Sequence, residues 1–90
     1  MLKQIDLEEL LTGDYVPVDV RSRERFMAGS LKGAVSLPLS EFSQHLEELP
    51  KERTICVYCD SGLISPTVGQ LLQELDFDVC ELAGGLERYF

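Results

Sequence analysis

The sequence predicts an α/β domain with a small, open, mostly parallel sheet and helices on both faces. Short apolar stretches typical of strands alternate along the chain with stretches of helical apolar spacing, which is the pattern of a parallel α/β fold. Residues 54–58 (Thr-Ile-Cys-Val-Tyr) are almost entirely apolar, as expected for a central strand that is covered on both faces. Glycine or proline follows several of the predicted elements and ends them.

The first two elements are a short helix and a strand. Asp6 can cap a helix over residues 6–11, because a glutamate follows at the third helical position, and Gly13 can end it. Residues 15–20 carry valine at every second position, as a strand with one buried side does. Pro17 lacks a backbone donor, so this strand is not expected to be hydrogen-bonded on both sides there.

The middle of the chain predicts two more helices around a short strand. Ser22 can cap a helix that stops at Gly29, and residues 34–37 form a strand that Pro38 terminates. A further helix is predicted from Ser40 to Pro50. Its apolar stripe consists of Phe42, Leu46 and Leu49.

The last third of the chain begins with a loop over residues 60–64, after the apolar strand. Ser65 and Pro66 then form a strong helix start, as a cap followed by a proline at the first helical position. The packed face of this helix is predicted to hold Val68, Leu71, Leu72 and Leu75. A last strand over residues 78–82, a Gly-Gly turn and a helical turn over residues 86–90 complete the chain.

Length and charge narrow the class of protein. Ninety residues, 44% of them apolar, are enough for one domain over residues 1–90 and too few for two. The net charge of −8 gives a surface that repels phosphate backbones, so no nucleic-acid partner is expected. No stretch approaches the roughly 20 apolar residues of a membrane span, and acidic residues interrupt the start of the chain. Together with three cysteines, this predicts a cytoplasmic protein with no membrane partner, and it leaves the oligomeric state open.

Cys59 is the candidate nucleophile. It lies between an apolar strand and a helix start, where parallel sheets bind their ligands. The loop after it contains glycine and serine, so backbone N–H groups can turn toward the sulfur, and the helix adds its positive dipole end. Both effects favour the thiolate and lower the pKa of the cysteine.

The other cysteines and the single histidine predict no metal site and no cofactor. Cys56 and Cys80 lie within strands and are interpreted as core residues. Cys56 and Cys59 form a C-x-x-C pair, but residues three apart in a strand point to opposite faces. His45 lies among polar and acidic neighbours, where a solvated side chain is expected, and nothing places it near Cys59.

Seven short motifs, taken in order, resemble the rhodanese-like domain family. They cover nearly the whole chain, from about residue 6 to residue 90: VDVR (18–21), ERF (24–26), GSLKGA (29–34), LPL (37–39), VYCDSG (57–62), FDV (77–79) and LAGGL (82–86). Each motif alone is weak, but the ordered set with these spacings is specific to that family.

The resemblance implies a fold and a reaction. It implies a single-domain sulfurtransferase or persulfide carrier that receives a sulfane sulfur on Cys59 and passes it to cyanide, a thiol or a protein. The donor and acceptor are then small molecules or proteins that carry a persulfide. By position, the substrate-binding loop consists of Asp60, Ser61, Gly62, Leu63, Ile64 and Ser65. Asp19 and Arg21 match the first motif and are expected to support the site rather than react.

The loop departs from the family pattern at two positions. Active relatives often carry arginine where this chain has Asp60 and Ile64, and a smaller departure is Ser30 in place of histidine. Arginine there grips an anionic oxoacid, which neither replacement does. At ~6 Å and an effective dielectric near 20, the Asp60 carboxylate would repel a thiolate or an anionic donor by about 2–3 kcal/mol. Weak activity with thiosulfate is therefore predicted, with a better case for a persulfide donor.

Two alternatives to a sulfurtransferase remain. The same two positions, Asp60 and Ile64, are also compatible with a catalytically weak or silent rhodanese-like interaction or regulatory module. A cysteine phosphatase also uses a nucleophilic cysteine in an anion-binding loop. Such enzymes need an arginine to close the loop, and Ser65 stands at that position.

Overall fold

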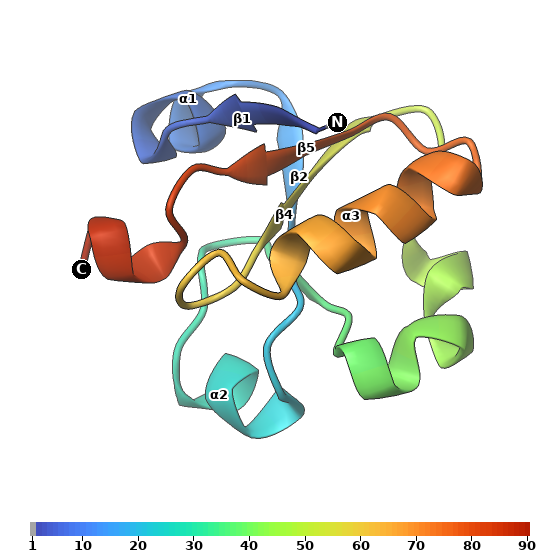
Figure 1. Ribbon diagram of the computed structural model, residues 1–90, viewed down its shortest axis with the longest axis horizontal. Coiled ribbons are helices and arrows are strands. Elements are labelled where there is room, and N and C mark those ends of the chain that lie inside the picture. Colours follow the sequence, from blue (N-terminus) through green and yellow to red (C-terminus); the bar gives the residue numbers. More distant parts are fainter. Residues whose placement is uncertain (1) are drawn as a thin grey trace.

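The computed structural model describes residues 2–90, and in these residues five parallel strands form one sheet with the order β1-β5-β4-β2-β3 (Figure 1). The sheet is thus wholly parallel, where the sequence predicted a mostly parallel one. The strands are β1 (Lys3–Ile5), β2 (Tyr15–Asp19), β3 (Val35–Ser36), β4 (Thr54–Tyr58) and β5 (Val79–Leu82).

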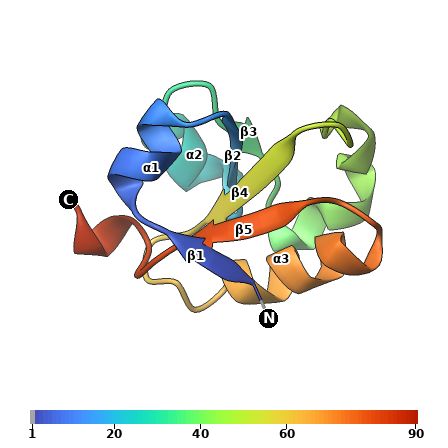
Figure 2. The same ribbon diagram turned by 90° about the horizontal axis from the view of Figure 1, so that it is seen from above.

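Helical segments cover both faces of the sheet, as the sequence predicted. One face carries α3 (Ser65–Glu74) with the 3-10 helices η1 (Leu39–Gln44) and η2 (Leu46–Glu48). The other face carries α1 (Leu7–Thr12) and the 3-10 helix η3 (Leu86–Arg88), so the sheet lies between two layers (Figure 2). A short helix, α2 (Arg23–Ala28), follows β2 at the end of the sheet (Figure 1). Across residues 2–90, no helix combines the length and apolarity needed to cross a membrane.

The apolar strand β4 is central and buried on both faces, as predicted. Val57 packs under α3 with Val68 and Leu72, and all three are fully buried. Cys56 and Tyr58 point to the opposite face, which α1 covers with Leu10. This central position places the residue after β4, Cys59, in the middle of the carboxyl edge of the sheet.

The predicted caps of the first two helices are confirmed. The Asp6 carboxylate accepts a hydrogen bond from the backbone N–H of Glu9 at 2.8 Å, and Ser22 Oγ accepts one from Arg25 at 3.3 Å. The sequence predicted that β2 is not hydrogen-bonded on both sides at Pro17. The register agrees, because β3 pairs with Val18 and Asp19 of β2, the two residues after Pro17. These local signals depend on neighbouring residues alone, which is why the sequence is sufficient to find them.

The sequence did not predict β1. This strand pairs in parallel with β5 at the edge of the sheet, and of its three residues only Ile5 is buried. Three residues with one inward side chain are too short to show a two-residue period. Its pairing therefore depends on the neighbouring strand.

The helix predicted from Ser40 to Pro50 is wrong. The segment forms two 3-10 helices that meet at His45, whose φ of −122° and ψ of 8° are not helical. Only half-buried side chains, Phe42 and Leu46, attach the two helices to the core. Such limited burial does not impose one regular helix on the segment, because most helical stability in proteins comes from tertiary packing.

The face and the start of α3 also differ from the prediction. Leu71 and Leu75 are 36% and 42% exposed, and the packed face instead includes Gly69 between Val68 and Leu72. The missing side chain at Gly69 lets Leu2 and Val57 approach the helix. Contact with the sheet decides which residues of α3 are buried. Apolar spacing alone predicts a wider buried face than the structure shows.

The corrected face of α3 leads to a stability prediction. Leu72→Ala should lower the free energy of unfolding by about 2–5 kcal/mol, because it removes a fully buried side chain. Leu75→Ala, a matched change at the half-exposed residue that ends α3, should cost less than about 1 kcal/mol. Urea unfolding followed by circular dichroism measures both values, and equal losses would contradict this packing.

Candidate active site

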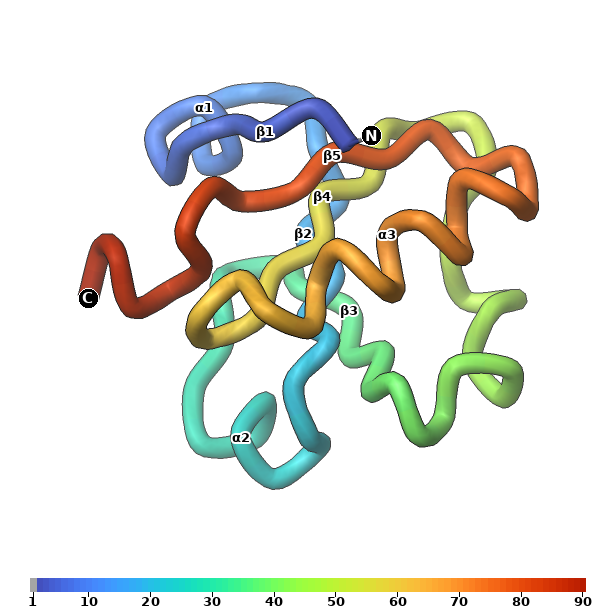
Figure 3. The backbone as a smooth tube through the Cα atoms, viewed as in Figure 1, coloured from blue at the N-terminus to red at the C-terminus, as the bar shows by residue number. Residues whose placement is uncertain are grey.

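The candidate site lies at the carboxyl edge of the sheet, where three chain segments meet. Cys59 follows β4, Arg21 follows β2, and the turn at Gly84 and Gly85 follows β5. From Cys59 the backbone makes a compact loop and enters α3 (Figure 3). Parallel strands bring these segments together because their carboxyl ends lie on the same side.

The loop forms a cradle around the sulfur of Cys59. The backbone N–H of Gly62 donates a hydrogen bond to Cys59 Sγ at 3.1 Å, and the Sγ lies 3.6 Å from the hydroxyl of Ser65, to which the thiol donates. Gly62 has a φ of +84°, a conformation that suits glycine and turns its N–H inward. The side chain of Cys59 itself is buried, with 3% exposed.

The cradle stabilises the thiolate of Cys59. Burial alone would raise the pKa of the thiol, since it disfavours the charged form. Hydrogen bonds from the Ser65 hydroxyl and from the backbone N–H groups of Ser65, Ile64 and Gly62 outweigh burial, so the pKa lies below its usual value. The pKa of Cys59 is therefore lowered, as the sequence predicted, and the Ser65 hydroxyl lowers it more than any one backbone N–H group does.

Ser65 does not cap α3 as the sequence predicted. Ile64 occupies the capping position, where its apolar side chain cannot accept a hydrogen bond, and Ser65 is the first helical residue. The Ser65 hydroxyl is fully buried and faces Cys59 on one side and Glu81 on the other. These partners come from distant parts of the chain, which local sequence rules do not consider.

The turn after β5 holds the cradle in place. Leu86 donates its backbone N–H to the carbonyl of Cys59 at 2.9 Å, and Glu87 donates to the carbonyl of Asp60 at 2.8 Å. Gly85 has a φ of +72°, and a Cβ atom there would lie 2.7 Å from the backbone nitrogen of Gly62. A glycine at this position lets the two loops pack backbone against backbone.

Arg21 connects the site to the sheet. Its guanidinium donates to the buried carboxylate of Asp19, with Nη2 at 2.7 Å from Oδ2, and to the carbonyl of Gly29 at 2.6 Å. Its Nη1 reaches Asp60 at 3.3 Å. Hydrogen bonds with Asp19 raise the pKa of Arg21 further above its already high value. Asp19 and Arg21 therefore lie beside the loop, and the supporting role that the sequence predicted for them stays a prediction.

The Asp60 carboxylate is paired with two arginines, which the sequence did not predict. Besides Arg21, it contacts Arg25 of α2, with Nε at 2.5 Å from Oδ2. These positive charges offset the repulsion of a thiolate or an anionic donor that Asp60 alone would exert. Arg25 appears in the sequence only as part of a short motif, and its distance to Asp60 depends on how α2 packs against the loop.

A hollow of about 230 Å³ leads to Cys59. Its walls include both arginines, Arg21 and Arg25, together with Ile64, so it combines charged and apolar groups. Leu63, which was predicted to bind substrate, is 80% exposed and lies outside this hollow. The other predicted loop residues surround the sulfur or line the approach to it.

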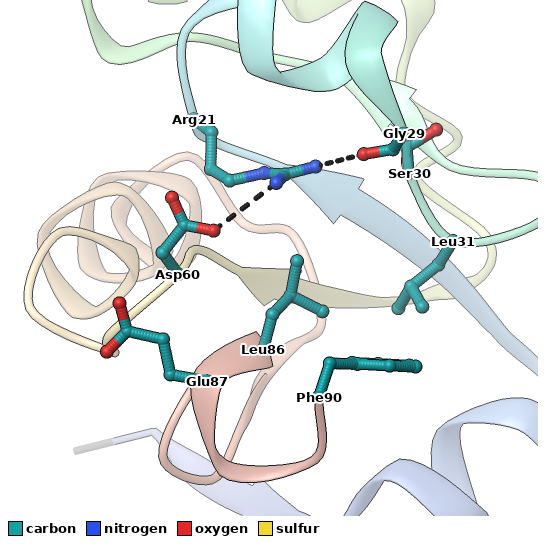
Figure 4. A pocket seen from close by; sticks show the side chains of 8 residues that line it. All are labelled: Arg21, Gly29, Ser30, Leu31, Asp60, Leu86, Glu87 and Phe90. Carbon is teal, nitrogen blue, oxygen red and sulfur yellow. Dashed lines mark hydrogen bonds and ion pairs between the residues drawn. The ribbon is translucent and has the colours of Figure 1, made fainter.

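A second hollow, of about 400 Å³, lies on the other side of the Arg21–Asp60 ion pair (Figure 4). Its apolar walls include Leu31, Leu86 and Phe90. Figure 4 shows these three side chains facing the hollow below the ion pair. The site thus offers an apolar surface next to the charged groups.

The remaining cysteines and the histidine lie away from the cradle. Cys56 and Cys80 are buried on the opposite face of the sheet, which confirms that they are core residues. A hydrogen bond with Cys80, together with burial, raises the pKa of the Cys56 thiol. His45 is held between Glu41 and Glu48, at 3.0 and 2.6 Å. Over the described part of the chain, no three His, Cys, Asp or Glu side chains are arranged to hold a metal ion.

Sequence reasoning also missed Glu81. Its carboxylate is buried on β5 and accepts a hydrogen bond from Ser65 Oγ at 3.3 Å. The signal in the sequence is a single acidic residue within an otherwise apolar strand, Val79–Leu82. An acid at an inward position of such a strand needs a polar partner, and here that partner also contacts the nucleophile.

The fold and the site together define an α/β domain that presents a cysteine in a backbone cradle. The family model of the rhodanese-like domain matches residues 4–90, and the chain belongs to the rhodanese-like family. This result confirms the resemblance inferred from the seven motifs.

Individual relatives agree with this assignment. The thiosulfate sulfurtransferase GlpE of Coxiella burnetii (strain RSA 331) is 32% identical over 77 residues, which are 84% of this chain and 72% of that protein. A tRNA sulfurtransferase of Desulfurococcus amylolyticus is 34% identical over 79 residues, 88% of this chain but only 16% of that protein. The crystal structure of a rhodanese-like domain protein from Staphylococcus aureus superposes with a TM-score of 0.87 at 23% identity, covering 99% of this chain and 92% of that one, and supports the fold.

The contact between the Gly-Gly turn and the cradle leads to a prediction about reactivity. Gly85→Ala should slow alkylation of Cys59 by iodoacetamide at neutral pH by about tenfold, because the new methyl group displaces Gly62 and weakens its hydrogen bond to the thiolate. Rates are measured by mass spectrometry of the Cys59 peptide.

Gly33→Ala is the matched control for this change. Gly33 also has a positive φ, +77°, but a Cβ atom there meets nothing within 4 Å. Both variants carry similar backbone strain, while only Gly85→Ala disturbs the cradle. Similar slowing in both variants would show that the turn does not hold the sulfur's environment in place.

Proposed function

We propose that this chain is a sulfurtransferase or persulfide carrier that uses Cys59. The observation that carries the proposal is the cradle, in which Gly62 and Ser65 contact a buried sulfur whose pKa is lowered. A thiolate at neutral pH is the nucleophile that sulfur transfer needs. The family assignment and the relatives named sulfurtransferases support the same reaction class.

The proposed reaction has two displacement steps. The Cys59 thiolate attacks the outer sulfur of a donor, the S–S bond of the donor breaks, and the donor leaves with the electron pair of that bond. Cys59 then carries a persulfide, whose negative charge the N–H of Gly62 can stabilise. An acceptor thiolate or cyanide attacks the outer sulfur and displaces the Cys59 thiolate, which completes the cycle. No net oxidation occurs, so the proposed cycle needs no cofactor.

We further propose that the donor and the acceptor are persulfides and thiols, carried by small molecules or proteins, rather than inorganic thiosulfate. Asp60 already occupies Arg21 and Arg25, and Ile64 contributes an apolar wall where active relatives offer a cation. The net charge of −8 also opposes a small dianion. The apolar hollow beside the ion pair supports an organic or protein partner.

Mass spectrometry after incubation with a low-molecular persulfide tests the proposed function. The protein should gain one sulfur atom, Cys59→Ser should abolish the gain, and a thiol acceptor should remove it. Cys56→Ser is the matched control, because this buried cysteine of β4 faces the other side of the sheet and its loss should leave the gain intact. Absence of a gain with every donor would favour a silent interaction or regulatory module, the alternative that the missing loop arginines support.

The paired arginines give a second prediction. Asp60→Asn should raise kcat/KM for thiosulfate with cyanide by about fivefold, because Arg25 and the Nη1 group of Arg21 lose their charged partner and can attract the dianion. Glu87→Gln removes an equal charge from the wall of the neighbouring apolar hollow and should change the value less than twofold. A sulfite-release or thiocyanate assay measures both, and equal increases would mean that only net charge matters.

A further inference from the structure

Glu81 is a buried acid that the proposed reaction does not use. It lies on β5 with 6% of its surface exposed, on the sheet face that α3 covers. Its Oε1 accepts a hydrogen bond from Gln4 Nε2 at 3.0 Å, and its Oε2 accepts one from Ser65 Oγ at 3.3 Å. One hydroxyl group therefore separates this carboxylate from the sulfur of Cys59.

Ser65 has one hydroxyl hydrogen and two anionic groups that compete for it. While Cys59 is a thiol, it donates to Ser65 Oγ at 3.6 Å, and Ser65 donates onward to Glu81. Once Cys59 loses its proton, the thiolate and the carboxylate both accept from the same hydroxyl. Because the hydroxyl has a single hydrogen, a Ser65 side chain that donates to Glu81 does not donate to the thiolate at the same time.

We infer that Glu81 is a positioning residue that acts on Cys59 through Ser65, by competing with the sulfur for the hydroxyl hydrogen. This inference rests on the proposed function of Cys59 as the nucleophile. With the hydrogen drawn toward Glu81, the thiolate charge depends more on backbone N–H groups such as that of Gly62. The sulfur then stays more basic and more nucleophilic than a cradle with a free hydroxyl would make it.

The other charged groups around the sulfur have partners of their own. In the hollow that leads to Cys59, Arg21 and Arg25 pair with Asp19 and Asp60. Glu87 lines the second, apolar hollow on the other side of the Arg21–Asp60 ion pair. These groups stay unchanged in the variants below.

Around Glu81, the packed elements contribute few titratable groups. Lys3 of β1 is exposed, and Cys56 of β4 and Cys80 of β5 belong to the opposite face of the sheet. The first turn of α3 carries no acid. A change confined to Glu81 therefore tests its link to Ser65.

The pH dependence of Cys59 alkylation tests the inference with Glu81→Gln. The new amide keeps the shape, accepts from Gln4 through its oxygen and donates to Ser65 Oγ through its nitrogen, so the serine hydrogen turns to the sulfur. The apparent pKa of Cys59 should fall by about one, which raises the thiolate fraction about tenfold at pH values where the thiol predominates. After the lower nucleophilicity is included, the iodoacetamide rate at these pH values should rise about threefold. At high pH the limiting rate should fall about threefold, because a less basic thiolate is a weaker nucleophile.

This paired change, a faster reaction at low pH and a slower one at high pH, is not expected from a loosened structure. Glu74→Gln, at the exposed end of α3, removes the same charge and should leave the profile unchanged. In a Ser65→Ala background the shift caused by Glu81→Gln should shrink by at least half, since the connecting hydroxyl is gone. A full shift in that background would overturn the inference in favour of direct charge repulsion.

Thermal unfolding shows whether each variant is folded. Glu81→Ser removes the charge with a smaller side chain, so it serves if Glu81→Gln does not fold, and it should shift the profile in the same direction. An unchanged profile in the folded variant would refute the role of Glu81. Alkylation needs no sulfur donor, so this result is independent of persulfide formation: a protein that never gains sulfur contradicts the proposed function, whereas an unshifted profile contradicts only the inference.

Discussion

The guanidinium of Arg21 is the interaction on which the arrangement of the site depends. It joins Asp19 at the end of β2, the carbonyl of Gly29 after α2, and Asp60 beside the nucleophile. Asp19 is fully buried, so its charge needs this partner, and removing one member of such a pair typically costs about 3–5 kcal/mol. Because the donors of this one side chain reach three partners, Asp19, Gly29 and Asp60, Arg21 sets the relative positions of three segments of the chain.

The charges of the site are balanced locally although the protein is strongly acidic. Asp60 would oppose a thiolate if it stood alone, but Arg21 and Arg25 pair with it. The same pairing leaves neither arginine free for an anionic donor. The cradle itself relies on uncharged donors, the Ser65 hydroxyl and backbone N–H groups, which stabilise the thiolate regardless of the net charge of −8. The reactivity of the sulfur and the choice of its donor are therefore governed by different groups.

Local signals account for the part of the fold that the sequence predicted. The caps Asp6 and Ser22, the valines of β2 and the apolar β4 act over a few residues, so their patterns can be read directly. The edge strand β1, the two 3-10 helices at His45 and the packed face of α3 were missed or wrong. Each of these depends on a neighbouring element, which supplies either the pairing or the burial.

The sequence by itself determined the α/β class, the order of strands β2 to β5 and the position of Cys59 between a central strand and a helix. These follow from apolar periodicity and from caps, which are properties of contiguous residues. Only the tertiary structure decided that Arg25 neutralises Asp60 and that Ser65 connects Cys59 to Glu81 rather than capping α3. Hydrogen bonds and ion pairs act over about 3 Å, and which side chains come within that distance depends on how the packed elements bring remote segments together.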